Sequence, residues 1–243
     1  MSTGPRAGTL EESQVRAMFD RIAGSYDLLN SVMTAGLHHR WRERAADLAQ
    51  AGPGDTVLDV ATGTGDLAVE LDRRVQPGGT VIGSDFSEEM LARARPKAPD
   101  IAFEWGNALD LPYESDRFDA VTVGFGARNF DDLEAGLREM TRVAKPGGRV
   151  VVLEITTPTK PPLSEFFRVW FDTVVPRLGR LTGESDAYTY LPNSVKRFPG
   201  AHELAATLDR VGLTEIRYLL TAGGIIAIHA GRKPLDGAGG PSS

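Results

Sequence analysis

The sequence predicts an α/β fold whose sheet is mostly parallel and ends in an antiparallel hairpin. Strand-like apolar segments alternate with helix-like segments along most of the chain, which is typical of right-handed βαβ units. The last two strand segments, 214–221 and 224–231, are joined by Ala222-Gly223, a connection too short for a parallel crossover. A third observation is that segment 56–61 runs into a glycine turn, an arrangement by which many α/β proteins hold a nucleotide.

The first part of the chain, residues 1–50, is expected to form a helical lid on the same domain. From Glu11 onward apolar residues recur at helical spacing, which predicts an amphipathic helix. A second helix is expected around Trp41–Gln50, and the break at 52–55 introduces the first strand.

Residues 51–233 are expected to form the main domain, followed by a disordered tail at 234–243. Ser87 precedes three helix-forming residues, two of them acidic, and is expected to cap a helix. Residues 145–148, with a proline and two glycines, are expected to end the helix at 131–143 before the next strand. The seven predicted strands are 56–61, 80–84, 101–105, 118–124, 148–155, 214–221 and 224–231.

Composition excludes several classes of protein. A chain of 243 residues can bury a full core, and its net charge of −6 argues against a general nucleic-acid binder. Without cysteine it has no disulfide, thiolate chemistry or cysteine-bound metal, and its four histidines are not spaced as a metal cluster. With no signal-peptide pattern and no apolar run approaching about 18 residues, the protein is expected to be cytoplasmic.

The residues around the glycine turn indicate which nucleotide it holds. Asp85 ends the second strand about 20 residues after the turn, where a nicotinamide enzyme would also place an acid for a ribose. Asp59 and Asp66 flank the turn itself, and carboxylates there would repel a pyrophosphate. They would attract a ligand that carries an amino group and a sulfonium, such as S-adenosylmethionine.

Five segments of the chain form a recognisable set of motifs. Two are long, 26–41 (YDLLNSVMTAGLHHRW) and 142–156 (RVAKPGGRVVVLEIT), and three are short, 124–129 (GFGARN), 188–194 (YTYLPNS) and 221–224 (TAGG). With the two long signatures matched in register and the three short ones in order, the chain resembles the ubiquinone/menaquinone biosynthesis C-methyltransferases over roughly residues 15–233.

This resemblance implies a class I methyltransferase, Rossmann-like fold with S-adenosylmethionine as the cofactor. It implies that Asp85 binds the ribose hydroxyls and that Asp59 holds the amino group, directly or through water. One departure is Gly124, which stands where the family commonly has a serine that touches the cofactor; the lost contact is worth about 0.5–1.5 kcal/mol. The resemblance also implies that Gly63, Thr64 and Gly65 face the methionine part of the cofactor. It implies that Asn107 and Ala108 frame the adenine.

The implied reaction is methylation of a ring carbon of a polyprenyl quinol, above all demethylmenaquinol to menaquinol. Arg128 and Asn129 follow the fourth strand and are candidates to stabilise the quinol oxyanion. Tyr26, Asn30 and His38 are candidates from the lid, with His38 a base of suitable pKa. Open alternatives are a ubiquinone-pathway benzoquinol or another small aromatic as acceptor, and a non-catalytic, cofactor-binding partner subunit.

Structural roles compete with these catalytic ones. Tyr26 and Trp41 would also serve to pack the N-terminal helices on the sheet. Asn30 would serve as a turn or cap residue. Arg128 would serve as an ion-pair partner of Asp131 or Asp132.

The insertion near 157–198 is expected to be a helical cap over the substrate. Its apolar face would receive a prenyl tail or contact a membrane surface, with Arg168, Arg177 and Arg180 for anionic headgroups. Core packing or a homodimer contact is the alternative, and Pro176 is expected to end the helix near Val175. The face comprises Leu163, Phe166, Phe167, Trp170, Phe171, Val174, Val175 and Leu178.

Overall fold

The computed structural model describes residues 20, 37–158, 160–170, 173 and 185–235. The predicted helix from Glu11, the candidates Tyr26 and Asn30, and the predicted helix end near Val175 therefore lie outside the described residues. So do most of the lid and the tail from residue 236 onward.

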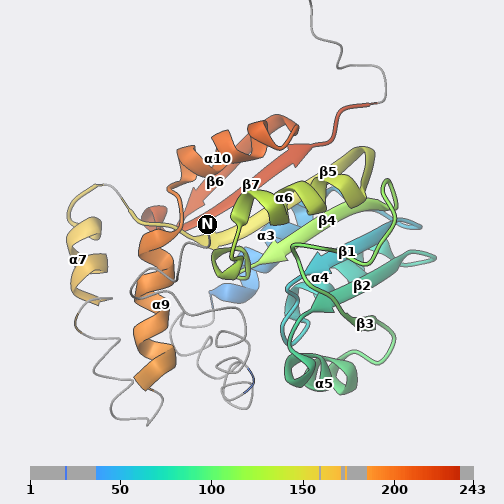
Figure 1. The fold of residues 1–243 in the computed structure, drawn as a ribbon, viewed down its shortest axis with the longest axis horizontal. Coiled ribbons are helices and arrows are strands. Elements are labelled where there is room, and N and C mark those ends of the chain that lie inside the picture. Colours follow the sequence, from blue (N-terminus) through green and yellow to red (C-terminus); the bar gives the residue numbers. More distant parts are fainter. Residues whose placement is uncertain (1–19, 21–36, 159, 171–172, 174–184, 236–243) are drawn as a thin grey trace, which may run out of the picture.

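A seven-stranded sheet forms the centre of the molecule (Figure 1), in the order β3-β2-β1-β4-β5-β7-β6. The first five strands are parallel, and β7 runs antiparallel to both β5 and β6. The predicted parallel sheet with a terminal hairpin is thus confirmed. The strands are β1 (Thr56–Val60), β2 (Thr80–Asp85), β3 (Ala102–Trp105), β4 (Phe118–Gly124), β5 (Ala144–Ile155), β6 (Thr214–Thr221) and β7 (Ile226–Arg232).

The start of β5 differs from the prediction. The strand begins at Ala144 and not at residue 148, because Ala144 already pairs with Phe118 of β4. The register then shifts, and Arg149 pairs with Ala120. An irregularity of this kind accommodates extra residues in one strand, so the proline-glycine segment lies within β5 instead of preceding it.

Alternating side chains of the central strands bury both faces of the sheet under helices. Val57 packs in the core beneath α3 (His38–Ala49), α4 (Asp66–Val75) and α5 (Glu88–Lys97). The next residue, Leu58, packs in the core beneath α6 (Leu133–Val143) and α10 (Ala201–Arg210). Every described helix is too short or too polar to cross a lipid bilayer.

Two further helices lie beside the sheet (Figure 1): α7 (Leu163–Val169) and α9 (Ser185–Arg197). Phe167 of α7 and Val195 of α9 form a small core of their own against Ile155 and Ile225. α9 also contacts the short 3-10 helix η1 (Ala127–Asn129), which follows β4. The cap insertion therefore reaches the loop that carries the predicted catalytic residues.

The helix starts follow local capping chemistry. The Ser87 hydroxyl accepts from the Met90 N–H at 3.2 Å, as predicted for the start of α5. Asp132 caps α6 in the same way through Ala135, so α6 begins at Leu133.

The strand order also locates the site. From β1 the chain builds outward to β2 and β3 on one side and to β4 and β5 on the other. The loops after β1 and β4 consequently diverge, and in open α/β sheets ligands bind in the crevice at such a point.

Candidate cofactor and active site

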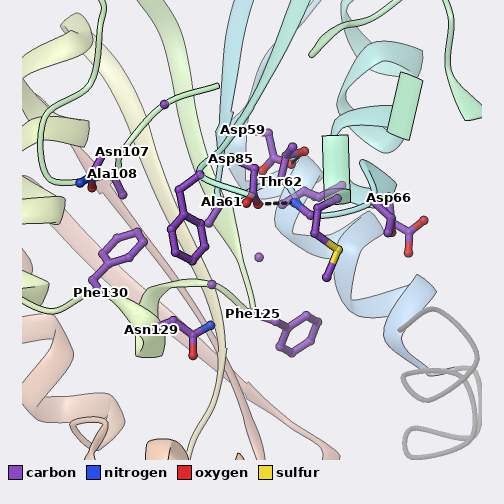
Figure 2. Close-up of a pocket in the computed structure, with 18 of the residues that line it drawn as sticks. Asp59, Ala61, Thr62, Asp66, Asp85, Asn107, Ala108, Phe125, Asn129 and Phe130 are labelled. Carbon is purple, nitrogen blue, oxygen red and sulfur yellow. Dashed lines mark hydrogen bonds between the residues drawn. The ribbon is translucent and has the colours of Figure 1, made fainter. Parts of the chain in front are cut away.

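A cavity of about 910 Å³, part of it open to solvent, lies at the carboxyl ends of β1, β2 and β4. Figure 2 shows Asp59 and Asp85 together at the strand ends, Asn107 and Ala108 at one end of the cavity, and Phe125 and Asn129 on the opposite wall.

The glycine turn after β1 shapes one wall. Gly63 and Gly65 both have positive φ, 58° and 82°, which side chains other than glycine adopt at a cost. A Cβ on Gly65 would lie 2.7 Å from Cζ of Phe103. A Cβ on Gly63 would meet no atom within 4 Å, so the positive φ, and not a lack of space, is what favours glycine there.

Asp85 links this turn to the end of β2. Its Oδ2 accepts from the Gly63 N–H at 2.8 Å, and its Oδ1 accepts from the Ser87 N–H at 2.9 Å (Figure 2, dashed line for Gly63). A carboxylate oxygen accepts more than one hydrogen bond, so Asp85 can also accept from the hydroxyls of a ribose. Burial raises the pKa of Asp85 to about 6, although these backbone hydrogen bonds oppose the rise.

Asp59, near the end of β1, is almost fully buried, and two hydroxyl groups hold it. Thr62 donates to its Oδ2 and Thr122 donates to its Oδ1, both at 2.7 Å. Burial raises the pKa of Asp59 to about 6 in spite of these hydrogen bonds. A cationic ligand would offset that desolvation, so the site favours a bound cation over an empty cavity.

Asp66, the first residue of α4, carries a third carboxylate. Arg42 Nη1 lies 2.9 Å from its Oδ2, and Lys97 forms a second ion pair with its Oδ1. Burial alone would raise the pKa of Asp66, but the charge of Arg42 and the hydrogen bond from Lys97 outweigh it and lower that pKa.

The opposite end of the cavity is suited to a flat, uncharged group. The Asn107 Oδ1 accepts from the Leu109 N–H at 2.9 Å, which fixes the loop after β3 against the cavity. Phe86, Ala108 and Leu109 supply apolar surface there. Together with the acids near β1 and β2, the donors and acceptors fit a nucleoside that carries a cationic tail.

Comparison with known proteins decides between the ligands that this geometry allows. The model of the ubiE/COQ5 methyltransferase family matches residues 8–233. The chain belongs to the ubiE/COQ5 methyltransferase family. It is a methyltransferase that uses S-adenosylmethionine, and the resemblance stated from its signatures is confirmed.

Two relatives and one solved structure illustrate the similarity. The demethylmenaquinone methyltransferase of Thermus thermophilus is 47% identical over 222 residues, which cover 89% of this chain and 100% of that protein. The protein of the same name from Desulfitobacterium hafniense is 41% identical over 235 residues, covering 94% and 93%. The structure of a SAM-dependent methyltransferase from Thermotoga maritima has a TM-score of 0.60 at 20% identity, covering 89% and 98%, and shows the shared fold.

The structure brings all seven predicted cofactor residues to the cavity or its edge. Six of them line it, and the seventh, Gly65, supports the turn from behind against Phe103. The six are Asp59, Gly63, Thr64, Asp85, Asn107 and Ala108. Gly124 also lines the cavity, at the position where the family commonly has serine.

The structure places the two predicted catalytic residues, Arg128 and Asn129, differently with respect to the cavity. Asn129 lines the cavity, and Figure 2 shows its amide nitrogen directed toward the interior. The Tyr190 hydroxyl donates to its Oδ1 at 3.1 Å. Arg128 instead lies behind the wall, with Nη1 2.8 Å from the buried Glu154 Oε1. The ion pair expected for Arg128 was with Asp131 or Asp132, whereas its partner in the structure is Glu154 of β5.

The structure also places His38 and reveals residues that sequence reasoning missed. His38 is buried at the start of α3, close enough to Asp66 for its charge to contribute to lowering that pKa. Arg42 and Phe125 line the cavity, and neither was singled out as a site residue. The available signal for Arg42 was its place directly after the Trp41 that ends the first signature.

Phe125 has a strained backbone, with φ of 60°. A bulky residue in this region costs about 1–3 kcal/mol and is held by its surroundings. Its N–H donates to the Leu153 carbonyl at 2.8 Å, and its ring makes an edge contact with Trp41. This conformation turns the ring into the cavity wall.

Proposed function

We propose that this chain transfers the methyl group of S-adenosylmethionine to a ring carbon of demethylmenaquinol and so produces menaquinol. The observation that carries this proposal is the pair of relatives named demethylmenaquinone methyltransferase, at 47% and 41% identity over most of both chains. The fold alone supports a methyltransferase of any acceptor.

Once bound, S-adenosylmethionine supplies a methyl group activated by a sulfonium. Asp59, Asp85 and the backbone of the glycine turn are the residues that would hold it, and the lid and cap would complete the acceptor site. A ring carbon is a weak nucleophile, and loss of the proton from a quinol hydroxyl increases its electron density. The protein's part is to place the ring within reach and to stabilise the oxyanion.

Asn129 is the group best placed for the oxyanion, because its amide nitrogen faces the cavity. Arg128 would help to stabilise the oxyanion through its charge. It would also hold η1 in place, because its backbone N–H donates to the Glu154 carboxylate at 3.2 Å. Tyr26 and His38 remain candidates from the lid for accepting the hydroxyl proton.

The cap supports an acceptor with a long apolar tail. On α7, Phe166 is 57% exposed and Val169 is 54% exposed, and Arg168, between them in the sequence, is exposed as well. Exposed apolar side chains with a basic residue on the same helix suit the surface of an anionic membrane, which supports a cytoplasmic enzyme with peripheral membrane contact. Contact between two copies through this face is the alternative.

The experiment uses the purified protein, labelled S-adenosylmethionine and a panel of chemically reduced acceptors. Demethylmenaquinol should be methylated, and prenylated benzoquinols should be methylated more slowly or not at all. Preferred methylation of a benzoquinol would reassign the acceptor. No transfer to any quinol, with cofactor binding intact, would contradict the proposal.

Variants separate binding from chemistry. Asp85→Ala should lose cofactor binding, because it removes the carboxylate that would accept from the ribose hydroxyls. Arg128→Ala, combined with Glu154→Gln to avoid an unpaired buried carboxylate, should keep binding and lose turnover. Glu154→Gln alone is the control. Equal loss of cofactor binding in the Arg128 and Asp85 variants would show that Arg128 is structural.

A further inference from the structure

Arg42 differs in charge from the rest of the cavity wall. It comes from α3, is 7% exposed and lines the same cavity as Asp59 and Asp85. Among the described residues that line this cavity it is the one with a basic side chain, whereas four others are aspartates. A single buried cation in an acidic site needs a specific reason.

The ion pair with Asp66 does not fully account for this cation. Nη1 of Arg42 is inaccessible to solvent and, although it lies 2.9 Å from Asp66 Oδ2, it makes no hydrogen bond of acceptable geometry. Asp66 is also paired with Lys97. Two cations thus face the carboxylate of Asp66, and the charge of Arg42 also acts on Asp59, whose pKa it helps to lower.

The surroundings hold the guanidinium in place for a ligand. Its Cζ lies 5.9 Å from the centre of the Phe125 ring, at a distance suited to a cation–π contact. Phe125 is itself fixed by its backbone hydrogen bond to Leu153. Asp66 begins the ten-residue helix α4, whose N-terminus also favours an anion.

The methionine part of S-adenosylmethionine carries one anion, its carboxylate, next to the amino group. The aspartates near β1 suit the amino group and the sulfonium, but they would repel the carboxylate. We propose that Arg42 binds the methionine carboxylate of S-adenosylmethionine. A guanidinium presents two parallel N–H groups to a carboxylate, which gives both charge and orientation. The proposal concerns the methyl donor and does not depend on which quinol is the acceptor.

The test measures binding by calorimetry without any acceptor. The two ligands are S-adenosylmethionine and decarboxylated S-adenosylmethionine, which keeps the amino group and the sulfonium but lacks the carboxylate. The proteins are the full chain and its variants Arg42→Met and Arg42→Lys. Arg74→Met is the matched control, because Arg74 also joins α4 to α3, through Asp47 at 2.7 Å, but does not line the cavity.

We expect the unaltered chain to bind S-adenosylmethionine about tenfold or more tightly than the decarboxylated ligand. Arg42→Met should remove this preference by weakening only the binding of S-adenosylmethionine, and Arg42→Lys should keep part of it. Arg74→Met should bind both ligands like the unaltered chain. The proposal would be overturned if Arg42→Met weakened the binding of both ligands equally, or if the unaltered chain showed no preference between them. Neither outcome would bear on whether the unaltered chain methylates a quinol.

Discussion

Acidification from pH 7 to pH 5 should weaken the binding of S-adenosylmethionine, because protons compete with the ligand for Asp59 and Asp85. Burial raises the pKa of both carboxyls to about 6 in the cofactor-free protein. The ionised forms are the ones expected to bind the ammonium group and the ribose hydroxyls. Affinity should therefore approach its full value well above pH 6 and fall as the pH drops through 6.

The size of the effect follows from the ionised fraction. A carboxyl with a pKa of about 6 is roughly nine-tenths ionised at pH 7 and one-tenth ionised at pH 5. Affinity should fall about tenfold if one carboxyl must be ionised and about 100-fold if both must be. Removing the Thr122 hydroxyl from Asp59 should raise its pKa further by about one to two units, because a hydrogen bond to a charged group is worth about 1.5–3 kcal/mol.

Calorimetry at several pH values, in buffers of different ionisation enthalpy, measures both the affinity and the protons released. Near pH 6, each half-protonated carboxyl should release about half a proton on binding. Thr122→Val should shift the loss of affinity to higher pH, whereas Thr80→Val, on the exposed start of β2, should not. Constant affinity between pH 7 and 5, with no proton release, would refute the assignment of these carboxylates to the cofactor.

Three further predictions concern other residues. Gly124→Ser should tighten cofactor binding by about twofold to tenfold, because the serine hydroxyl would contact the cofactor. The Leu67 side chain, 3.0 Å from the new Cβ, must move slightly to make room. Gly124→Ala is the control, and an equal gain from both variants would show that the hydroxyl contact is not the cause. Tyr190→Phe should leave cofactor affinity within about twofold and lower the turnover number, because Asn129 loses its 3.1 Å partner; unchanged turnover would show that this contact is dispensable. Burial lowers the pKa of His229 from 6.5 to about 4, so the neutral imidazole stabilises the fold above pH 6.5. The free energy of unfolding should therefore fall by about 3 kcal/mol as the pH drops to 4. Denaturant titrations of His229→Phe should lack this part of the pH dependence, and identical pH profiles of the two proteins would contradict the prediction.

Local patterns predicted the strands, the hairpin and the capping of α5 because each depends on neighbours in the chain. The serine at position 87 is followed by the N–H groups it caps, and Ala222-Gly223 allows only a hairpin whatever surrounds it. The start of β5 was predicted four residues late because its pairing with Phe118 depends on a distant strand. Proline and glycine indicate an interruption but not whether a strand continues through it.

In the cofactor site, as in the fold, the sequence predicted the residues at strand ends but not the contacts between distant segments. Asp59 and Asp85 stand at strand ends, and the sheet topology brings strand ends together. Tyr190 contacts Asn129 from a helix that begins more than fifty residues later, and Glu154 pairs with Arg128 from β5. No spacing along the chain encodes these two contacts, because they arise from the packing of the cap and sheet.

By itself, the sequence determined the fold class, the family and the methyl donor, since these depend on hydrophobic periodicity and on motifs that are continuous in the chain. Tertiary structure alone decided which side chains share one cavity. It placed Asn129 in the wall and Arg128 behind it, and it brought Arg42 of α3 to face Asp66 of α4. The physical reason is that burial and the distances between charges depend on how the helices pack on the sheet, and these determine the pKa values and the binding of the ligand.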